Sequence, residues 1–598
     1  MAKDLSPADA LLAGIDTLPG KSLLAAGGVA LSLYLLYRQA LPKPLPGIPF
    51  DEESAKRILG DVPYLQAMKD QGLAARMFWP EQFDKYGTAV SQYFMGPTQK
   101  AAVALGDYRE VHDLLLRHGK DLCRGPLVAS VWHGVMPAHF IGMEEDNPAF
   151  KAAKALGKDL MTPSFLHEVN APASYQKVLS IVKLWQFKSE LAEGRAFDAA
   201  VDLGYLTYDI ITAAALNIDD NDTQIRKYIR ELGELKQPAT VPASTTEPAE
   251  FPPSELTDML SALFTIAGAS GKAFQVPSPK LFHLFNNRTA KMKKAYHDRD
   301  TIIRSYIGDA VRRLQEEGDN FKPTSAMDFI VMREAAAAKK ENRAPDFYSD
   351  TVVQVTFGYL LGGQDSTHAT LSFLVKRIGA NQAVQTRLRD TLRKAFPEAW
   401  SQRAQPPLQE LVKAQIPYLD AVIEEVLRID PPAVGITRET KKEIKILGHT
   451  IPKDTVLFLS FMGPTYTSKG FLPEKTGEAL RSESSRSHAG AYDVDDWTKS
   501  GYPADEYHPD RWLKESEDGS GELTFNPRAG PFLTFSTGTR VCWGKRLAYL
   551  ELKLVVTVLV WNFVFERLPE NLEDWVYDED LFMKPKNCRV KLSSAWDV

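Results

Sequence analysis

The segment from Phe535 to Gly544 constrains this chain more than any other, because its sequence, FSTGTRVCWG, places one cysteine in a short loop between two glycines. Gly538 and Gly544 can give the loop a tight, open backbone, since glycine reaches conformations closed to other residues. Arg540 can neutralise a nearby anion, and Phe535 can shield the sulfur from water. We therefore expect Cys542 to bind a metal. The plainer alternative is a buried structural cysteine.

The spacing F-x-x-G-x-R-x-C-x-G resembles the haem-binding loop of the cytochrome P450 family at each of its defined positions. The resemblance implies that Cys542 is the axial thiolate ligand of haem iron. It implies that the cofactor is surrounded by Phe535, Gly538, Arg540 and Gly544. It also implies a mainly α fold with small β-sheets, the cytochrome P450-like fold, preceded by one N-terminal transmembrane helix.

The composition fits a large globular protein without a disulfide framework. Of the 598 residues, 44% are hydrophobic and 25% charged, which is ordinary for a folded domain. A net charge of −6 argues against a nucleic-acid partner, which calls for a basic surface. The three cysteines (Cys123, Cys542 and Cys588) are too scattered for a disulfide scaffold. A reducing compartment suits a cysteine that must stay a free thiolate.

An apolar run from Ser22 to Leu41 predicts a transmembrane anchor. Its 20 residues carry one charge, Arg38, and about 20 apolar residues span a bilayer. The charges on either side favour a lumenal segment at 1–21 and a cytosolic body. A proline-rich hinge at 42–50 then leads to a catalytic domain at 51–598. By resemblance the membrane is that of the endoplasmic reticulum; a cleaved signal peptide or a core helix are the alternatives.

The apolar run Thr351–Lys376 predicts a buried helix. Inside it, Gly362–Thr367 reads GGQDST, and each mid-helix glycine costs about 1 kcal/mol relative to alanine. Either the helix ends here, with Asp365 or Ser366 capping the next one, or the stretch has a function. In the functional interpretation the glycines leave room for a flat cofactor, and the acid and hydroxyl groups deliver protons.

The stretch resembles the family's A/G-G-x-D/E-T-T/S motif. The resemblance implies catalytic roles for the acid Asp365, the alcohol Ser366 and the following Thr367. Serine replaces the usual threonine at 366, which keeps the hydroxyl but loses the methyl group that fixes its rotamer.

Two further segments also resemble family motifs. Tyr418–Arg428 resembles the E-x-x-R helix, and Tyr507–Trp512 resembles the P-x-R-F/W stretch. The resemblance implies a buried ion-pair network and two further haem contacts. The network residues are Glu425, Arg428 and Arg511; the contacts are Arg438, at a propionate beside Arg540, and Lys154, where the family often has arginine. A solvated lysine is the alternative for Lys154.

The resemblance implies a haem-thiolate monooxygenase that inserts one oxygen atom from O2 into a small apolar substrate by hydroxylation or epoxidation, in fungal secondary metabolism. No flavin or nicotinamide fingerprint is evident, so electrons must come from an NADPH-dependent cytochrome P450 reductase, with cytochrome b5 as a further donor. Lys545 and Arg546, just past the loop, are predicted to help the reductase dock.

The predicted substrate pocket is drawn from apolar residues that also fit an ordinary core: Phe140, Phe357, Leu361, Val434, Ile436 and Phe582. The polar segment 482–500 is predicted to be a surface insertion. Two other functions stay open at this point. One is a haem-thiolate isomerase or dehydratase acting on a peroxide, and the other is a non-catalytic haem-binding membrane protein.

Overall fold

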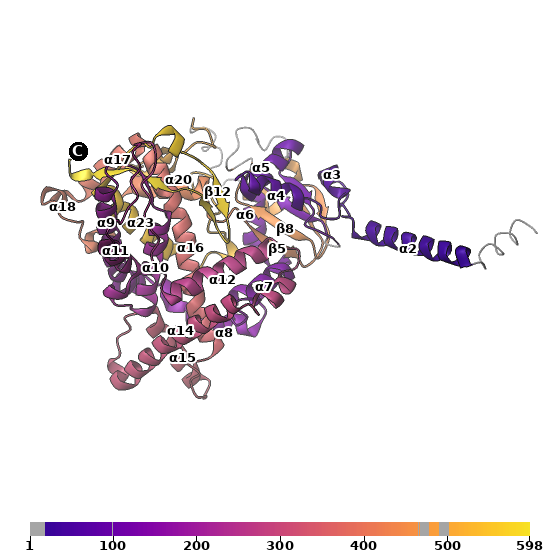
Figure 1. Ribbon diagram of the computed structural model, residues 1–598, viewed down its shortest axis with the longest axis horizontal. Coiled ribbons are helices and arrows are strands. Elements are labelled where there is room, and N and C mark those ends of the chain that lie inside the picture. Colours follow the sequence, from indigo (N-terminus) through magenta and orange to yellow (C-terminus); the bar gives the residue numbers. More distant parts are fainter. Residues whose placement is uncertain (1–17, 98–99, 464–465, 467–477, 489–500, 598) are drawn as a thin grey trace, which may run out of the picture.

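The computed structural model describes residues 18–97, 100–463, 466, 478–488 and 501–597. Figure 1 shows a helix-rich body from which one N-terminal helix, α2 (Leu18–Ala40), stands clear. The body is mainly α-helical with small sheets, as predicted.

The long helix α16 (Asp350–Ala380) runs through the middle of the body (Figure 1). It begins where the Ser349 hydroxyl accepts the N–H of Val352, and it continues unbroken through 362–367. The alternative of a helix end in that stretch is therefore wrong. Buried residues lie on all its faces, against α10 (Ala200–Leu216), α20 (Pro417–Ile429) and α23 (Lys545–Asn562).

The other helices complete the body. The longer ones are α5 (Ala74–Tyr86), α6 (Tyr108–Arg117), α9 (Ala171–Leu191), α11 (Gln224–Glu234), α12 (Asp258–Phe274), α14 (Ala290–Glu317), α15 (Ala326–Lys340) and α17 (Gln382–Ala395). The shorter ones are α3 (Glu52–Ala55), α4 (Val62–Asp70), α7 (Gly125–His133), α8 (Pro148–Leu156), α13 (Pro279–Asn286), α18 (Pro397–Ser401), α19 (Leu408–Lys413) and α21 (Glu483–Ser487).

The largest sheet has the order β1-β2-β8-β5-β3. Its strands are β1 (Val90–Tyr93), β2 (Ala102–Leu105), β8 (Val456–Ser460), β5 (Gly435–Thr440) and β3 (Leu122–Cys123). β2 and β8 are parallel, and the other pairs are antiparallel. This sheet positions the site because β5 carries Arg438, and its partner β3 leads directly to Arg124.

Small two-stranded sheets complete the β structure. They pair β6 (Ile444–Ile446) with β7 (His449–Ile451), β9 (Leu513–Glu515) with β10 (Leu523–Phe525), β11 (Phe563–Phe565) with β15 (Leu592–Ser594), β12 (Tyr577–Glu579) with β13 (Met583–Pro585), and β14 (Arg589–Val590) with β4 (Phe197–Asp198). The β12–β13 hairpin packs against α16 and brings the end of the chain to the central helix.

The predicted apolar run at 22–41 is helical, as α2. Its residues from 25 to 39 are exposed. No helix among the described residues combines the length and the apolarity needed to cross a membrane. The predicted lumenal segment lies mostly outside the described residues. The hinge at 42–50 is tied to the body, because the Gln92 side-chain amide donates to the carbonyls of Leu45 and Ile48.

The start of the predicted insertion is bound to the body, because the Ser482 and Ser484 hydroxyls donate to Asp113 of α6. Arg481, the residue before the insertion, is buried, and its guanidinium donates to both carboxylate oxygens of Asp107, at 2.7 and 2.8 Å. Asp107 also caps α6 by accepting the N–H of Glu110. Residues 478–488 therefore pack on the start of α6, whereas the sequence predicted a plain surface loop. The long-range ion pair between Arg481 and Asp107 accounts for the difference. Residues 489–500 lie outside the described chain.

Candidate active site

The cysteine loop, residues 535–544, leads from the body into α23. The Cys542 N–H donates to the Phe535 carbonyl at 2.8 Å, which closes the loop. Gly538 lies in the left-handed region, with φ of +74°. A Cβ at this position would stand 2.2 Å from the carbonyl oxygen of Leu115 in α6. Glycine is therefore required at 538 both for backbone conformation and for space.

Gly544 plays a smaller role than predicted. It precedes the first residue of α23 with φ of −79°, a value open to any residue. A Cβ there would meet no atom within 4 Å in the described structure. The expectation that Gly544 supplies a special backbone conformation is wrong, because the turn is made at Gly538.

The Cys542 thiol is accessible but poorly hydrated. The residue is exposed, yet burial raises the pKa of its thiol. The N–H groups of Gly544 and Lys545 and the Lys545 charge act in the opposite direction. The sulfur can therefore be reached by a ligand. Phe535 is buried beside it, as predicted.

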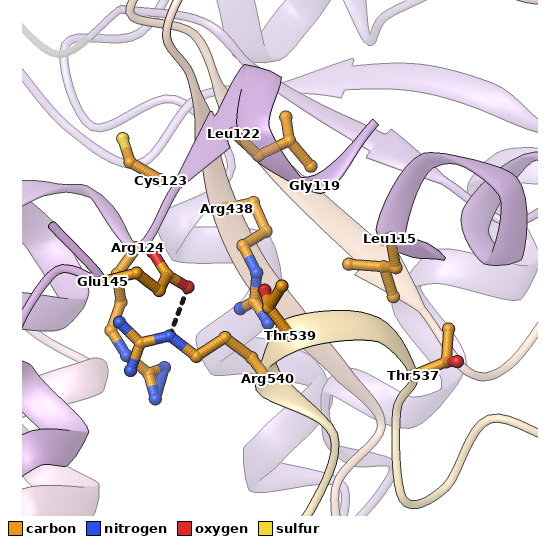
Figure 2. Close-up of a pocket in the computed structure, with 10 residues that line it drawn as sticks. All are labelled: Leu115, Gly119, Leu122, Cys123, Arg124, Glu145, Arg438, Thr537, Thr539 and Arg540. Carbon is orange, nitrogen blue, oxygen red and sulfur yellow. Dashed lines mark hydrogen bonds and ion pairs between the residues drawn. The ribbon is translucent and has the colours of Figure 1, made fainter. Parts of the chain in front are cut away.

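Three arginines line a pocket next to this loop (Figure 2). Arg438 comes from β5, Arg540 from the cysteine loop and Arg124 from the residue before α7. Burial, together with the neighbouring guanidinium charges, lowers the pKa of Arg124 to about 9 and that of Arg438 to about 10. Glu145 accepts a hydrogen bond from Arg540 Nε at 2.5 Å. The pocket holds more positive than negative charge and so favours a bound anion.

Arg124 was not predicted from the sequence. Its Nε is buried without a hydrogen-bond partner in the described part of the chain. No motif marks it, because it reaches the pocket only through the antiparallel pairing of β3 with β5, which aligns Cys123 with Glu439. A buried guanidinium with an unused donor is suited to a carboxylate ligand.

Lys154 does not join the arginine pocket. It is half-buried in the last turn of α8, with its Nζ 5.6 Å from the centre of the Phe150 ring. Arg540 also lies over this ring, with its Cζ 4.4 Å from the ring centre. The structure places Arg124, rather than Lys154, among the residues lining the pocket with Arg438 and Arg540.

The Gly362–Thr367 stretch includes an exposed glycine in the otherwise buried helix α16. Gly362 is exposed in a buried part of α16, and a Cβ there would meet nothing within 4 Å. The Ser366 hydroxyl donates to the Gly362 carbonyl at 2.8 Å. Asp365 forms an ion pair with Lys584 of β13. Thr367 is buried near Glu551, whose pKa burial raises to about 8, while the Asn170 and Thr367 side chains act in the opposite direction.

These features together fit the haem that the resemblance implies. The exposed thiol of Cys542 offers one sulfur ligand to iron. The surplus of guanidinium groups offers partners for two propionate carboxylates. The bare backbone at Gly362 leaves room for a flat ring and a small gas molecule beside it.

The predicted ion-pair network is complete and fully buried. Glu425 accepts hydrogen bonds from Arg428 Nε and Nη2 and from Arg511 Nε, each at 2.8 Å. It also accepts the Trp512 indole N–H at 2.8 Å and the His508 backbone N–H at 2.9 Å. Burial opposes the charge of Glu425, but the two arginines prevail and lower its pKa. The sequence indicated the three charged residues and missed these two neutral donors.

The network is joined to the cysteine loop. The Thr534 hydroxyl donates to the Leu427 carbonyl of α20 at 2.7 Å. Thr534 directly precedes Phe535, so the buried carboxylate and the start of the loop are held by the same helix.

Four of the predicted substrate-pocket residues, Phe140, Phe357, Leu361 and Val434, lie in the main core cluster or pack against it. Phe357 and Leu361 are buried in the main core, and Phe357 packs against Arg299. Phe140 lies beside the cysteine loop, 6.1 Å from the Trp543 ring. Ile436 packs against a second cluster, under the large sheet. The half-buried Val434 and Phe582 are near one another in the fold, because the Met583 N–H donates to the Pro432 carbonyl at 2.9 Å.

A second buried carboxylate lies next to the network. Glu424 is buried on α20, and burial raises its pKa to about 7. It accepts a hydrogen bond from the Tyr549 hydroxyl of α23, and the Tyr549 ring centre is 5.2 Å from that of Phe535. This acid ties α20 to α23 beneath the cysteine loop.

Comparison with known proteins agrees with this geometry. The family model "Cytochrome P450" matches residues 65–471 and 502–592. Cytochrome P450 monooxygenase TRI13 of Fusarium sporotrichioides is 32% identical over 586 residues, covering 95% of this chain and 98% of the relative. Cytochrome P450 monooxygenase xilC of Penicillium rubens is 31% identical over 576 residues, covering 96% of each. The Hps1-dma1 cluster cytochrome P450 monooxygenase cyp3.1 of Dothistroma septosporum is 29% identical over 312 residues, covering 50% of this chain and 98% of the relative.

Replacing Glu424 with glutamine is expected to remove one source of pH-dependent stability. The folded-state pKa of Glu424, about 7, lies above its unfolded value of 4.5. The folded chain therefore keeps a proton that the unfolded chain releases, and stability falls as pH rises from 4.5 to about 7. Glu424→Gln should gain free energy of unfolding relative to wild type across this window, by at most about 3 kcal/mol.

Urea unfolding at pH 5, 6, 7 and 8 measures this effect. Glu522→Gln, at an exposed position in the loop between β9 and β10, is the matched control, and its free energy of unfolding should follow that of wild type at every pH. A constant difference between Glu424→Gln and wild type from pH 5 to 8 would contradict the assignment.

Proposed function

Since the chain belongs to the cytochrome P450 family, we propose that it works at the endoplasmic-reticulum membrane on a small apolar substrate of fungal secondary metabolism. The reaction class follows from the family. The protein is a haem-thiolate monooxygenase, an oxidoreductase that inserts one oxygen atom of O2 into its substrate. The structural observation that best supports this function is the exposed Cys542 thiol. Its loop lies beside a pocket in which arginine side chains outnumber carboxylates.

Different residues of the chain are assigned to ligation, cofactor binding and proton transfer. Haem, when bound, supplies oxygen activation, and thiolate ligation favours O–O cleavage. Cys542 would provide the thiolate, which metal coordination would hold in its deprotonated form. Arg124, Arg438 and Arg540 would hold the propionates. Asp365 and Ser366 of α16 would hold and move protons at their carboxylate and hydroxyl oxygens, and the Glu425 network fixes the loop that carries Cys542.

The substrate is proposed from the pocket wall and the relatives. Val434 and Phe582 are half-buried apolar residues on segments that meet beside α16, which suits a small apolar molecule. One relative is named for a cluster, and the others are monooxygenases of filamentous fungi. Their names favour a monooxygenase over the isomerase, dehydratase and non-catalytic alternatives.

The reduced carbon monoxide difference spectrum tests the thiolate assignment. Wild-type protein should show the red-shifted band of thiolate-ligated haem, and Cys542→Ser should lose it because a hydroxyl is a poor thiolate substitute. Cys588→Ser, at a buried cysteine whose thiol donates to the Ser372 carbonyl, is the matched control and should keep the band. A freshly prepared wild type without the band would overturn the assignment.

We propose that an NADPH-dependent reductase docks at the start of α23, with cytochrome b5 as a further donor. Lys545 and Arg546 are exposed there, directly after the cysteine loop. Reversing both to glutamate should slow reductase-driven haem reduction, measured by carbon monoxide trapping, at an unchanged spectrum. The same double reversal at Lys339 and Lys340, exposed at the end of α15, should have little effect. Equal slowing in both variants would remove the docking proposal.

We propose that α2 attaches the enzyme to the membrane as a single-pass anchor, with the body in the cytosol. Its exposed leucines, including Leu31, Leu33, Leu35 and Leu36, are between 57% and 61% accessible and suit burial in lipid. Leu33→Lys together with Leu36→Lys should reduce flotation of the full chain with phosphatidylcholine vesicles. Flotation unchanged by these substitutions would exclude α2 as the anchor.

A further inference from the structure

A buried histidine lies against the central helix one turn before Gly362. The His139 ring faces Gly358 of α16, where a Cβ would stand 2.2 Å from the imidazole Nε2. Positions 358 and 362 are four residues apart and lie on the same face of the helix. Gly362 is exposed on that face, where a Cβ would meet nothing within 4 Å. His139 therefore borders the space that Gly362 leaves open for the cofactor and a small gas molecule.

The main chain on either side of His139 is fixed. The Ala138 N–H donates to the side-chain oxygen of Gln354 on α16 at 2.7 Å. On the other side, the Arg540 guanidinium donates to the Phe140 carbonyl at 3.4 Å. This segment therefore connects the central helix to the cysteine loop, with the imidazole between them.

The hydrogen bonds of the imidazole decide which ring nitrogen carries the proton. Nδ1 of His139 accepts the Ile141 N–H at 3.1 Å, at the start of the short 3₁₀ helix η2 (Phe140–Gly142). An acceptor nitrogen of a neutral imidazole carries no hydrogen, so the proton is on Nε2. Burial, together with the charge of Arg124, lowers the pKa of His139 to about 3, so the ring is neutral at physiological pH. Stacking on Phe140, with the ring centres 4.2 Å apart, holds its plane.

The Nε2–H group is a donor available to a ligand. Among the residues that the structure describes, the one hydrogen bond of the His139 ring is made by Nδ1. A buried donor without an acceptor is unfavourable, so an oxygen atom of a bound molecule would stabilise it. Because the ring is neutral, it suits an uncharged oxygen, whereas carboxylates have arginine partners in the adjacent pocket.

We propose that His139 determines substrate specificity, with its Nε2–H donating to an uncharged ketone or ether oxygen of an otherwise apolar substrate that lies beside Gly362. The proposal rests on the monooxygenase function given above and narrows its substrate to molecules that carry such an oxygen. Gly358 contributes by leaving the space that the imidazole occupies. Since the hydrogen bond fixes one point of the substrate, it also favours oxidation at one carbon atom over the others.

Binding of two ligands of nearly the same shape tests the proposal. 2-Adamantanone has a carbonyl oxygen where 2-methylideneadamantane has a methylidene group. Titration of the full haem-loaded chain, followed by the change in haem absorbance, gives a dissociation constant for each. Because the two ligands differ in hydrophobicity, the ratio of the two constants is compared between variants.

His139→Asn should lower the preference for the ketone by about two- to tenfold, which is the range of one neutral hydrogen bond. The asparagine oxygen can still accept the Ile141 N–H, but the shorter side chain does not reach the position of the imidazole Nε2. His297→Asn, at an exposed histidine on α14, is the matched control and should keep the wild-type ratio.

A second pair of variants leaves the imidazole in the chain. Gly358→Ala places a methyl group in the space that the ring occupies, and it should reduce the ketone preference to a similar extent. Gly379→Ala, also on α16, is its control, because a Cβ there would lie 3.7 Å from the Phe565 Cβ, an ordinary contact. All four variants should keep the carbon monoxide band of wild type.

Equal ratios in wild type, His139→Asn and Gly358→Ala overturn the proposal, as does a wild type that binds neither ligand. Loss of haem from both variants at an unchanged ketone preference would assign the Nε2–H to a cofactor carboxylate and overturn it as well. A wild type without the thiolate band overturns the proposed function. A wild type with the band but equal ratios overturns the specificity inference alone.

Discussion

The carboxylate of Glu425 is the interaction on which the rest of the site depends. A fully buried charge is costly unless every lone pair has a partner, and Glu425 receives two guanidinium groups, an indole N–H and a backbone N–H. These donors come from α20 and from residues 508–512, separated by about 80 residues of chain. Removing any partner would leave buried charge behind, so the network permits one arrangement of these segments. The hydrogen bond from Thr534 to the Leu427 carbonyl ties the cysteine loop to this fixed arrangement.

Positive charge is concentrated on the opposite side of the loop without such compensation. Arg124, Arg438 and Arg540 share one pocket with Glu145, and the pKa values of Arg124 and Arg438 are lowered by burial and by mutual repulsion. A protein rarely buries guanidinium groups without anionic partners. The protein residues of this pocket therefore supply too few carboxylates for its arginines. Cofactor carboxylates would remove the repulsion. Binding of the cofactor and stability of the fold are therefore coupled.

The central helix α16 also contains residues that are unfavourable in a buried helix. α16 is buried nearly all round, yet it holds two adjacent glycines, an acid and two hydroxyls in its middle. Packing explains Gly363, where a Cβ would lie 2.5 Å from the Ile211 side chain. It does not explain Gly362, which faces open space. The Asp365 carboxylate is stabilised by Lys584, from a hairpin more than 200 residues later. This ion pair joins α16 in the core to the hairpin that forms the proposed pocket wall.

What the sequence determined by itself was the set of short-range motifs: the Cys542 loop, the α16 stretch and the Glu425–Arg428 pair one helical turn apart. Such features are readable because their geometry is fixed by neighbouring residues in the chain. The tertiary structure decided the rest. It placed Arg124 rather than Lys154 in the charged pocket, required glycine at 538 rather than at 544, and gave Asp365 its partner Lys584. Each of these depends on which distant segments pack together, and local spacing carries no record of a contact made across hundreds of residues.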